Sequence, residues 1–358
     1  MFSFIRIEFV ISFNTLKKLF IIMMLLLFTC SGYAQLGSYA GAFSRMGFTT
    51  RGLGLSNAVV SDVFGGTSGI YNPALSTFQE DGKVDLSYTF LSFDRKLHFL
   101  GFTKKFKLPK QKSGGAGITI AWLNAGVGDI DSRDNDTRQT GMLSTFENEF
   151  YLGTGFILSD KISAGIGFKL YYAKLYEDVT ATSFAVDFGG VYKAGENLSF
   201  GLSFIDLGAK YEWQTSQLYG SNGNTTEDKF PAVLNLGGSY LLPKNLGIAS
   251  LAIQQYFNPS LTVPADDSTG TDLIENSNNT VFRFGVEINV IKQLKLRAGM
   301  DRIDFSAEDF SGNLKPSFGL SLDKSFSKTI NLGFDYALQV EPFSHDLIQN
   351  IGIVFKFK

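Results

Sequence analysis

The sequence predicts an all-β protein: an antiparallel up-and-down transmembrane β-barrel of about fourteen strands, with an N-terminal hatch segment in its lumen. Three observations predict it. Segments of alternating apolar and polar residues recur from Lys83 to the end, and no long amphipathic helix interrupts them. Tight and long connections alternate between these segments. The 358 residues include 38 glycines and 35 phenylalanines, with a mean hydropathy of only +0.06, which suits strands that are apolar on one face.

The N-terminus predicts a secretory signal peptide. Lys17 and Lys18 precede an unbroken apolar run at residues 19–28, and small residues follow up to Ala34. A basic flank, a short apolar core and a small-residue cleavage site are the features of such a peptide, whereas a membrane helix needs about 20 apolar residues. We therefore expect export and cleavage after Ala34. The predicted organisation is a signal peptide at 1–34, a hatch at 35–82 and a transmembrane barrel at 83–358.

The single cysteine, Cys30, lies within the predicted signal peptide. It could carry a lipid, but Thr29 is larger than the residue that normally precedes a lipidated cysteine. The favoured interpretation is that Cys30 is removed with the signal peptide. The mature chain would then have neither disulfides nor thiolate metal sites.

Residues 35–82 differ from the rest of the chain, because they keep neither a helical nor a strand period. About eight strands fill a barrel with their own side chains, and about fourteen leave a lumen that a plug can occupy. The glycine-rich stretch at 42–78 is the candidate plug, since glycine permits close backbone approach and Asn-Pro favours a turn. Its candidate functional residues are Arg45, Arg51, Gly52, Gly54, Asn72, Pro73 and Ala74.

The remaining chain reads as strands separated by turns or loops. The predicted strands are 83–92, 95–106, 115–125, 147–158, 162–174, 183–193, 198–206, 232–242, 249–258, 280–291, 294–300, 316–322, 330–338 and 349–357.

Alternation is plainest near the C-terminus, where Phe282, Phe284 and Val286 would share one face. In a soluble sandwich this face would meet a second sheet, and in a membrane barrel it would meet lipid. Alternation alone does not separate the two. Charges of both signs occupy the opposite face, where they would either hold the hatch, with Arg45 and Arg51 as partners, or solvate the lumen. The predicted lumen-facing charges, earlier strands included, are Lys169, Asp187, Arg283, Glu287, Lys295, Arg297 and Asp335.

Connection lengths favour the membrane barrel, because outer-membrane barrels have short turns on one rim and long loops on the other. The first connections depart from this rule, since Phe93-Asp94 is tight and 107–114 is longer. The tight connections after even-numbered strands are 159–161, 194–197, 241–247 and 292–293. The long polar connections after odd-numbered strands are 126–146, 207–231, 259–279 and 301–315.

The C-terminal residues supply an independent signal. Asn350, Gly352, Phe355 and Phe357 form a polar-x-Gly-x-x-aromatic-x-aromatic pattern, which resembles the final-strand signal for insertion of outer-membrane barrels. Lys358 departs from it, because such chains commonly end on the aromatic residue. The alternative is an ordinary amphipathic edge strand.

Catalytic and metal-binding signatures are absent from the sequence. His98 and His345 lie far apart and outside any metal-ligand spacing. Four aspartates between Asp129 and Asp136 could attract calcium, but Arg133 replaces an oxygen ligand of the EF-hand pattern, and solvated loop residues are the favoured interpretation. A net charge of −2 gives no attraction for nucleic acid. We expect no enzyme activity, no cofactor and no metal.

Three motifs of the hatch segment resemble the N-terminus of the PorV/PorQ family, relatives of FadL-type channels in Bacteroidota. They are Phe43-Ser44-Arg45-Met46-Gly47, the run from Arg51 to Ala58, and Tyr71-Asn72-Pro73-Ala74. Leu296-Arg297-Ala298-Gly299 and Asp335-Tyr336-Ala337 are similar to closing strands of that family. The resemblance implies an outer-membrane barrel of about fourteen strands with an N-terminal hatch.

Three functions stay open at this point. The resemblance implies an accessory of type IX protein secretion that binds cargo or secretion components. A FadL-like channel for small hydrophobic molecules is the second, and a structural outer-membrane protein is the third. All three predict the outer membrane as location and its lipid as partner.

Overall fold

The computed structural model describes residues 39–107, 115–257, 261–263, 273–275, 279–303, 314–341 and 346–358. The predicted signal peptide with Cys30, the first hatch residues 35–38, and His345 lie outside these ranges. In the described part, no helix has both the length and the apolar character needed to cross a membrane.

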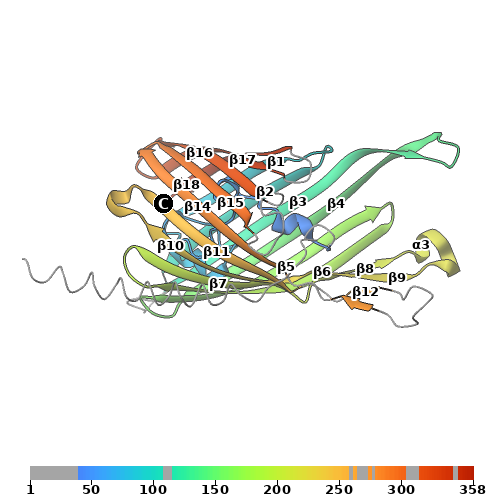
Figure 1. Ribbon diagram of the computed structural model, residues 1–358, viewed down its shortest axis with the longest axis horizontal. Helices are drawn as coiled ribbons and strands as arrows, with labels where there is room; N and C mark the ends of the chain where they lie inside the picture. The colour runs from blue at the N-terminus through green and yellow to red at the C-terminus, as the bar shows by residue number, and fades with distance from the viewer. Residues whose placement is uncertain are drawn as a thin grey trace, which may run out of the picture.

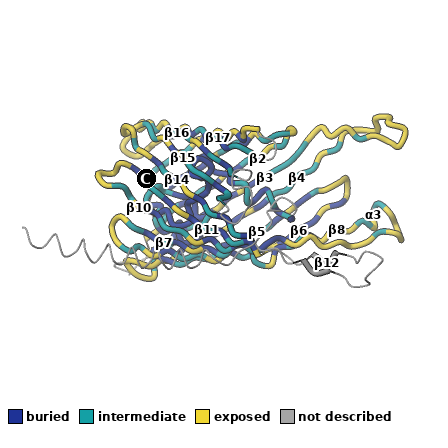
Figure 2. Tube along the Cα trace, viewed as in Figure 1, coloured by how far each residue is buried: buried dark blue, intermediate teal, exposed yellow. Residues whose placement is uncertain are grey.

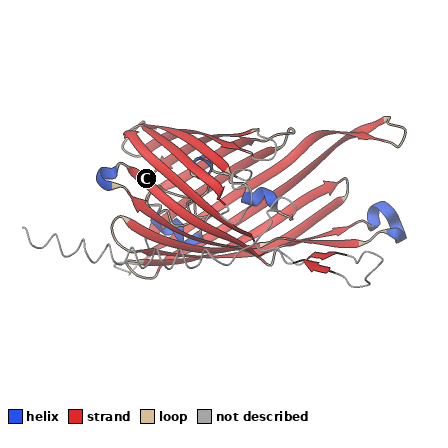
Figure 3. Ribbon diagram, in the orientation of Figure 1, coloured by secondary structure: helices blue, strands red, loops and turns tan. Residues whose placement is uncertain are grey.

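Fourteen antiparallel strands close into a single barrel, which confirms the predicted fold class (Figures 1 and 3). They are β1 Gly82–Phe90, β2 Lys96–Lys107, β3 Gly115–Arg133, β4 Gln139–Ile157, β5 Ile162–Tyr176, β6 Val179–Lys193, β7 Leu198–Leu207, β10 Ala232–Leu241, β11 Gly247–Phe257, β14 Asn279–Ile291, β15 Leu294–Ile303, β16 Lys315–Ser325, β17 Ile330–Val340 and β18 Leu347–Phe357. Neighbours in this order pair with each other, and β1 closes the ring against β18. Two further hairpins, β8 Lys210–Gln214 with β9 Thr225–Lys229 and β12 Leu261–Val263 with β13 Leu273–Glu275, form separate sheets.

The outer face of the barrel is apolar. Leu251, Phe284 and Phe334 are 51%, 41% and 45% exposed, whereas the alternate residues Ala252 and Arg283 are buried. Buried and less buried residues follow one another along the strands of the ring (Figure 2). Closure pairs the backbone of every strand, so the sheet has no free edge within the ring. An apolar band around a closed sheet is the surface that a barrel presents to hydrocarbon.

The two rims differ, as predicted, but two of the predicted long loops contain regular secondary structure. Tight turns such as 194–197 and 292–293 connect strands at the end that holds the C-terminus (Figure 1). At the opposite end the predicted loop 126–146 is mostly strand, since β3 continues to Arg133 and β4 begins at Gln139. The polar residues of this segment suggested a loop. They form two paired strands instead, because strands that project into water do not need an apolar face. The predicted loop 207–231 likewise contains β8, β9 and a short helix, α3 Ser216–Tyr219.

The predicted insertion signal occupies the closing strand β18. Asn350 and Gly352 face the lumen, where the Asn350 side chain hydrogen-bonds to Thr50 and to Thr89. Phe355 is exposed on the outer face. Strand β18 therefore belongs to the ring itself, and its role in insertion stays a prediction.

Candidate functional site

The described part of the hatch segment, residues 39–81, lies inside the barrel. Ser56 meets Ser317 of β16 at 2.7 Å, and Ser61 meets Ser239 of β10 at 2.8 Å. Because these strands lie apart around the ring, the segment crosses the lumen. Its short helices are visible between the strands in Figure 3. They are η2 Ala42–Arg45, α2 Thr50–Gly54 and η3 Pro73–Phe78.

Local sequence explains where two of these helices begin. The Thr49 hydroxyl accepts a hydrogen bond from the Gly52 amide at 3.0 Å, which caps α2. The Asn72 side chain accepts from the Ala74 amide at 3.1 Å, and Pro73 stands at the first helical position, where its missing N–H costs nothing. The Asn-Pro-Ala motif therefore starts a 3-10 helix.

Asn72 also attaches the hatch to the barrel wall. Its side-chain amide lies 2.9 Å from the Val60 carbonyl oxygen and 3.2 Å from the carbonyl oxygens of Gly190 on β6 and Leu202 on β7. Asn72 is fully buried. One side chain thus links two parts of the hatch to two neighbouring strands.

A belt of lumen-facing glycines lets the hatch backbone pack directly against the wall. A Cβ atom added to Gly117 would lie 2.2 Å from the Ser76 carbonyl carbon, and one added to Gly201 would lie 2.4 Å from the Val60 carbonyl oxygen. Any larger residue would have to displace the hatch. This glycine belt consists of Gly117, Gly155, Gly165, Gly189, Gly201, Gly237, Gly285, Gly299, Gly319 and Gly352.

Arg51 forms the centre of a buried charge network between hatch and wall. Its guanidinium lies 2.6 Å from Asp62 in the hatch and 2.9 Å from Glu287 on β14. Glu287 in turn meets Arg297 at 2.7 Å, and Arg297 meets Asp335 at 3.3 Å. Burial lowers the pKa of Arg51, but Asp62 and Glu287 outweigh this and raise it above its usual value, so Arg51 stays charged.

The structure places the other predicted charges elsewhere. Lys295 pairs with Asp323 at 3.4 Å and is outside the Arg51 network. Arg283 pairs with Asp301 at 2.6 Å. Arg45 donates to the Ala40 carbonyl oxygen at 2.9 Å, within the hatch.

Two predicted glycines of the hatch are sites of close contact. A Cβ on Gly52 would lie 2.0 Å from the Tyr71 hydroxyl, and one on Gly54 would lie 3.3 Å from the Gly319 Cα. Substitution of Gly52 would therefore separate two parts of the hatch, whereas substitution of Gly54 would press on the wall.

An acidic cluster on β4 to β7 forms a second buried network. Lys169 lies 2.7 Å from Asp206, 3.1 Å from Asp187 and 3.8 Å from Glu149. The Tyr171 hydroxyl donates to Asp206 at 2.7 Å. Sequence reasoning identified Lys169 and Asp187 as inward charges but missed Glu149 and Asp206. Glu149 alternates in phase with the buried Tyr151, which was the available signal.

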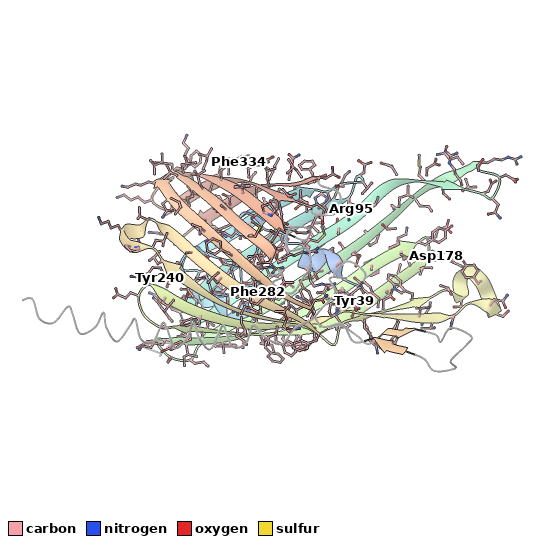
Figure 4. The ribbon with its side chains drawn as sticks, in the orientation of Figure 1. Tyr39, Arg95, Asp178, Tyr240, Phe282 and Phe334 are labelled. Carbon is pink, nitrogen blue, oxygen red and sulfur yellow. The ribbon has the colours of Figure 1, made fainter. Side chains whose placement is uncertain are left out.

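An aromatic cluster fills the lumen toward the end with the long hairpins. Phe48 of the hatch lies with its ring centroid 5.0 Å from Phe99, and Tyr171 lies 4.8 Å from Phe230. Tyr211 of β8 completes the cluster, 4.9 Å from Phe230. The hatch enters the lumen from this end, since Tyr39 lies on the side of the β5–β6 turn residue Asp178 (Figure 4). The hairpin β8–β9 thus contributes to the lumen as well as to the rim.

A cavity of about 50 Å³, lined by both polar and apolar residues, lies between the hatch and the wall. The hatch contributes Arg45, Asn57 and Tyr71, and the wall contributes Glu149 and Gln254, among other residues. Glu149 and Lys169 belong to both the acidic cluster and the cavity lining.

The candidate metal ligands of the sequence are not brought together. Among the described residues, no three His, Cys, Asp or Glu side chains are placed to hold a metal ion. His98 packs its ring edge-on to Tyr88 at 4.7 Å. Asp131 pairs with the exposed Arg133 at 2.6 Å on the projecting ribbon.

Comparison with known proteins gives matches in structure only, because no family model and no curated protein sequence matches this chain. The toluene transporter TbuX of Ralstonia pickettii superposes with a TM-score of 0.55 at 13% identity, over 87% of this chain and 98% of that one. The monoaromatic hydrocarbon channel CymD gives 0.54 at 12% identity, over 87% and 96%. A FadL homologue of Pseudomonas aeruginosa gives 0.53 at 12% identity, over 86% and 97%.

The barrel has the FadL-like fold. At these identities the likeness concerns architecture, and it extends along nearly the whole length of the FadL-like chains. It agrees with the superfamily that the hatch motifs suggested. No match points to PorV or PorQ in particular.

Proposed function

We propose that this protein is an outer-membrane channel for small hydrophobic molecules and not an enzyme. The aromatic cluster carries the proposal. It gathers aromatic side chains inside a barrel whose other lumen residues are largely polar, and one of them, Phe48, lines the cavity beside the hatch. Apolar pockets lined by aromatic side chains bind small hydrophobic ligands.

The hatch would act as the gate of this channel. The glycine belt and the Arg51 network hold it against the wall on several sides, so a solute that passes along the lumen requires the hatch to move. The FadL-like structures described as a toluene transporter and a monoaromatic hydrocarbon channel support this class of solute.

Uptake of radiolabelled toluene tests the proposal, in Gram-negative cells that lack their own channel of this fold. Phe230→Ala removes a ring that contacts Tyr171 and Tyr211, and the loss of about 1.5 kcal/mol of apolar contact with the solute predicts an uptake rate reduced about tenfold. Tyr219→Ala is the matched control, because Tyr219 is 65% exposed on α3. Uptake equal to that of cells without the protein would refute the proposal.

Location in the outer membrane is checked in the same cells. A folded barrel should fractionate with the outer membrane and migrate differently on gels before and after heating. A soluble periplasmic protein would contradict the proposed location.

A type IX secretion accessory is the second candidate, and the projecting ribbon of β3 and β4 favours it. Residues 128–141 of the ribbon extend past the pairing of β3 with β2 and of β4 with β5. Ile130 is 37% exposed within this segment and Met142, directly after it, is 61% exposed, which offers apolar surface to a partner. Affinity purification in mild detergent should then recover secretion components or cargo, and their loss on removal of residues 128–141 would locate the contact.

A further inference from the structure

A half-buried arginine, Arg45, and a buried glutamate, Glu149, line the cavity from opposite sides, one on the hatch and one on the wall. Glu149 is only 1% exposed, yet neither of its carboxylate oxygens accepts a hydrogen bond from a described residue. Its nearest cation, Lys169, is 3.8 Å away and lies closer to Asp187 and Asp206. Glu149 therefore keeps hydrogen-bonding capacity toward the cavity.

Arg45 and Asn57 line the same cavity with free donors. The Arg45 Nη2 atom donates to the Ala40 carbonyl oxygen, whereas its Nη1 atom is buried and has no partner among the described residues. The Asn57 side-chain oxygen accepts from Tyr71 at 3.2 Å, and its nitrogen is buried and unpartnered. The wall also contributes Lys169 and Arg283, which are paired with Asp206 and Asp301. The groups left without hydrogen-bond partners are therefore donors on the hatch and an acceptor, Glu149, on the wall.

We propose that this cavity binds a small zwitterion such as a short amino acid, with the carboxylate at Arg45 and Asn57 and the ammonium group at Glu149. A buried polar group that lacks a hydrogen-bond partner is costly. A solute with both charges can hydrogen-bond to the donors of Arg45 and Asn57 and to the acceptor Glu149 at the same time. A simple anion or cation can bond to only one of these two sides, and the groups on the other side stay without partners.

The volume limits the size of this solute. A buried water needs about 10–15 Å³ of cavity volume. The cavity of about 50 Å³ therefore has room for about four waters, or for a solute of about five or six non-hydrogen atoms. Glycine and alanine fit this limit, and leucine exceeds it.

This site does not rest on the proposed hydrocarbon channel, although Phe48 belongs to the aromatic cluster and also lines the cavity. The aromatic cluster suits an apolar solute, whereas the cavity groups that would hold the zwitterion are polar. Either site can fail its test without affecting the other.

Equilibrium dialysis of radiolabelled glycine against the full mature barrel in detergent micelles tests the site. We expect saturable binding of one glycine per barrel, competition by alanine, and at least tenfold weaker competition by acetate, methylammonium and leucine. Glu149→Gln and Asn57→Asp should each raise the dissociation constant at least tenfold with little change in shape. Glu177→Gln, an exposed turn variant, should bind as the parent does.

Heat-modifiable gel mobility identifies variants that are folded before binding is measured. Absence of saturable glycine binding to the parent barrel overturns the proposal, as does unchanged binding by both folded cavity variants. Acetate binding as tight as glycine binding overturns the zwitterionic assignment.

Discussion

Replacing Arg51 with methionine should release the hatch from the barrel wall. Methionine keeps much of the length and apolar volume of arginine but removes the charge that joins Asp62 to Glu287. The fourteen-stranded ring does not depend on this contact, since its closure is made by backbone pairing of β1 with β18. The variant should therefore assemble while its hatch is loosened.

The free-energy cost of losing the Arg51 ion pairs follows from how deeply these charges are buried. Arg51 is 9% exposed and Glu287 is 2% exposed, and removing one partner of a buried ion pair costs about 3–5 kcal/mol. Both carboxylates keep other donors: Asp62 accepts from Thr67 at 2.9 Å, and Glu287 keeps Arg297. We therefore expect the lower end of about 3 kcal/mol, which is about a hundredfold increase in the displaced state.

Single-channel recording in planar bilayers measures this change. The R51M barrel should open about a hundredfold more often than the parent, with a conductance close to that of a barrel without its hatch. Arg133→Met is the matched control, because Arg133 pairs with Asp131 on the exposed ribbon and such pairs contribute about 0–1 kcal/mol. An R51M barrel as closed as the parent would refute the role given to the network.

Three further outcomes are expected. Deletion of residues 42–78 should raise single-channel conductance, and an unchanged conductance would contradict a plug in the lumen. Gly201→Val should displace the hatch and expose it to protease, at a cost of about 1–3 kcal/mol from overpacking, whereas Gly190→Val should not, because a Cβ there meets nothing within 4 Å. Deletion of Phe357 and Lys358 should reduce the assembled, heat-modifiable fraction in cells if β18 carries the insertion signal, and normal assembly would indicate an ordinary closing strand.

Much of the barrel could be predicted from the sequence, because the period of a strand is local. Phe282, Phe284 and Val286 alternate with polar residues whatever they pair with, and tight turns such as 292–293 show where strands reverse. The predicted strand boundaries were wrong where β3 and β4 project beyond the rest of the ring. Residues 126–146 lose the apolar alternation there, yet they continue as β3 and β4 by pairing with each other.

The contacts of the candidate site could not be predicted from the sequence. Arg51 and Glu287 could each be identified as charges on a hatch and on a lumen face, but 236 positions separate them, and only ring closure brings them together. The same holds for Glu149 and Arg45, which line one cavity from the wall and from the hatch. The acidic cluster depends in addition on Asp206, whose positive φ of 62° turns its amide toward the Asp187 carboxylate.

The amino-acid sequence by itself determined a strand-rich chain with an apolar and a polar face and an irregular, glycine-rich segment before it. Those properties are set by residues next to one another, so they can be read in order along the chain. The tertiary structure alone decided which wall glycine seats which part of the hatch, which charges pair across the lumen, and which polar groups are left facing a cavity. These contacts depend on the register of fourteen strands around a closed ring. A local sequence pattern does not specify which distant residues become neighbours when the ring closes.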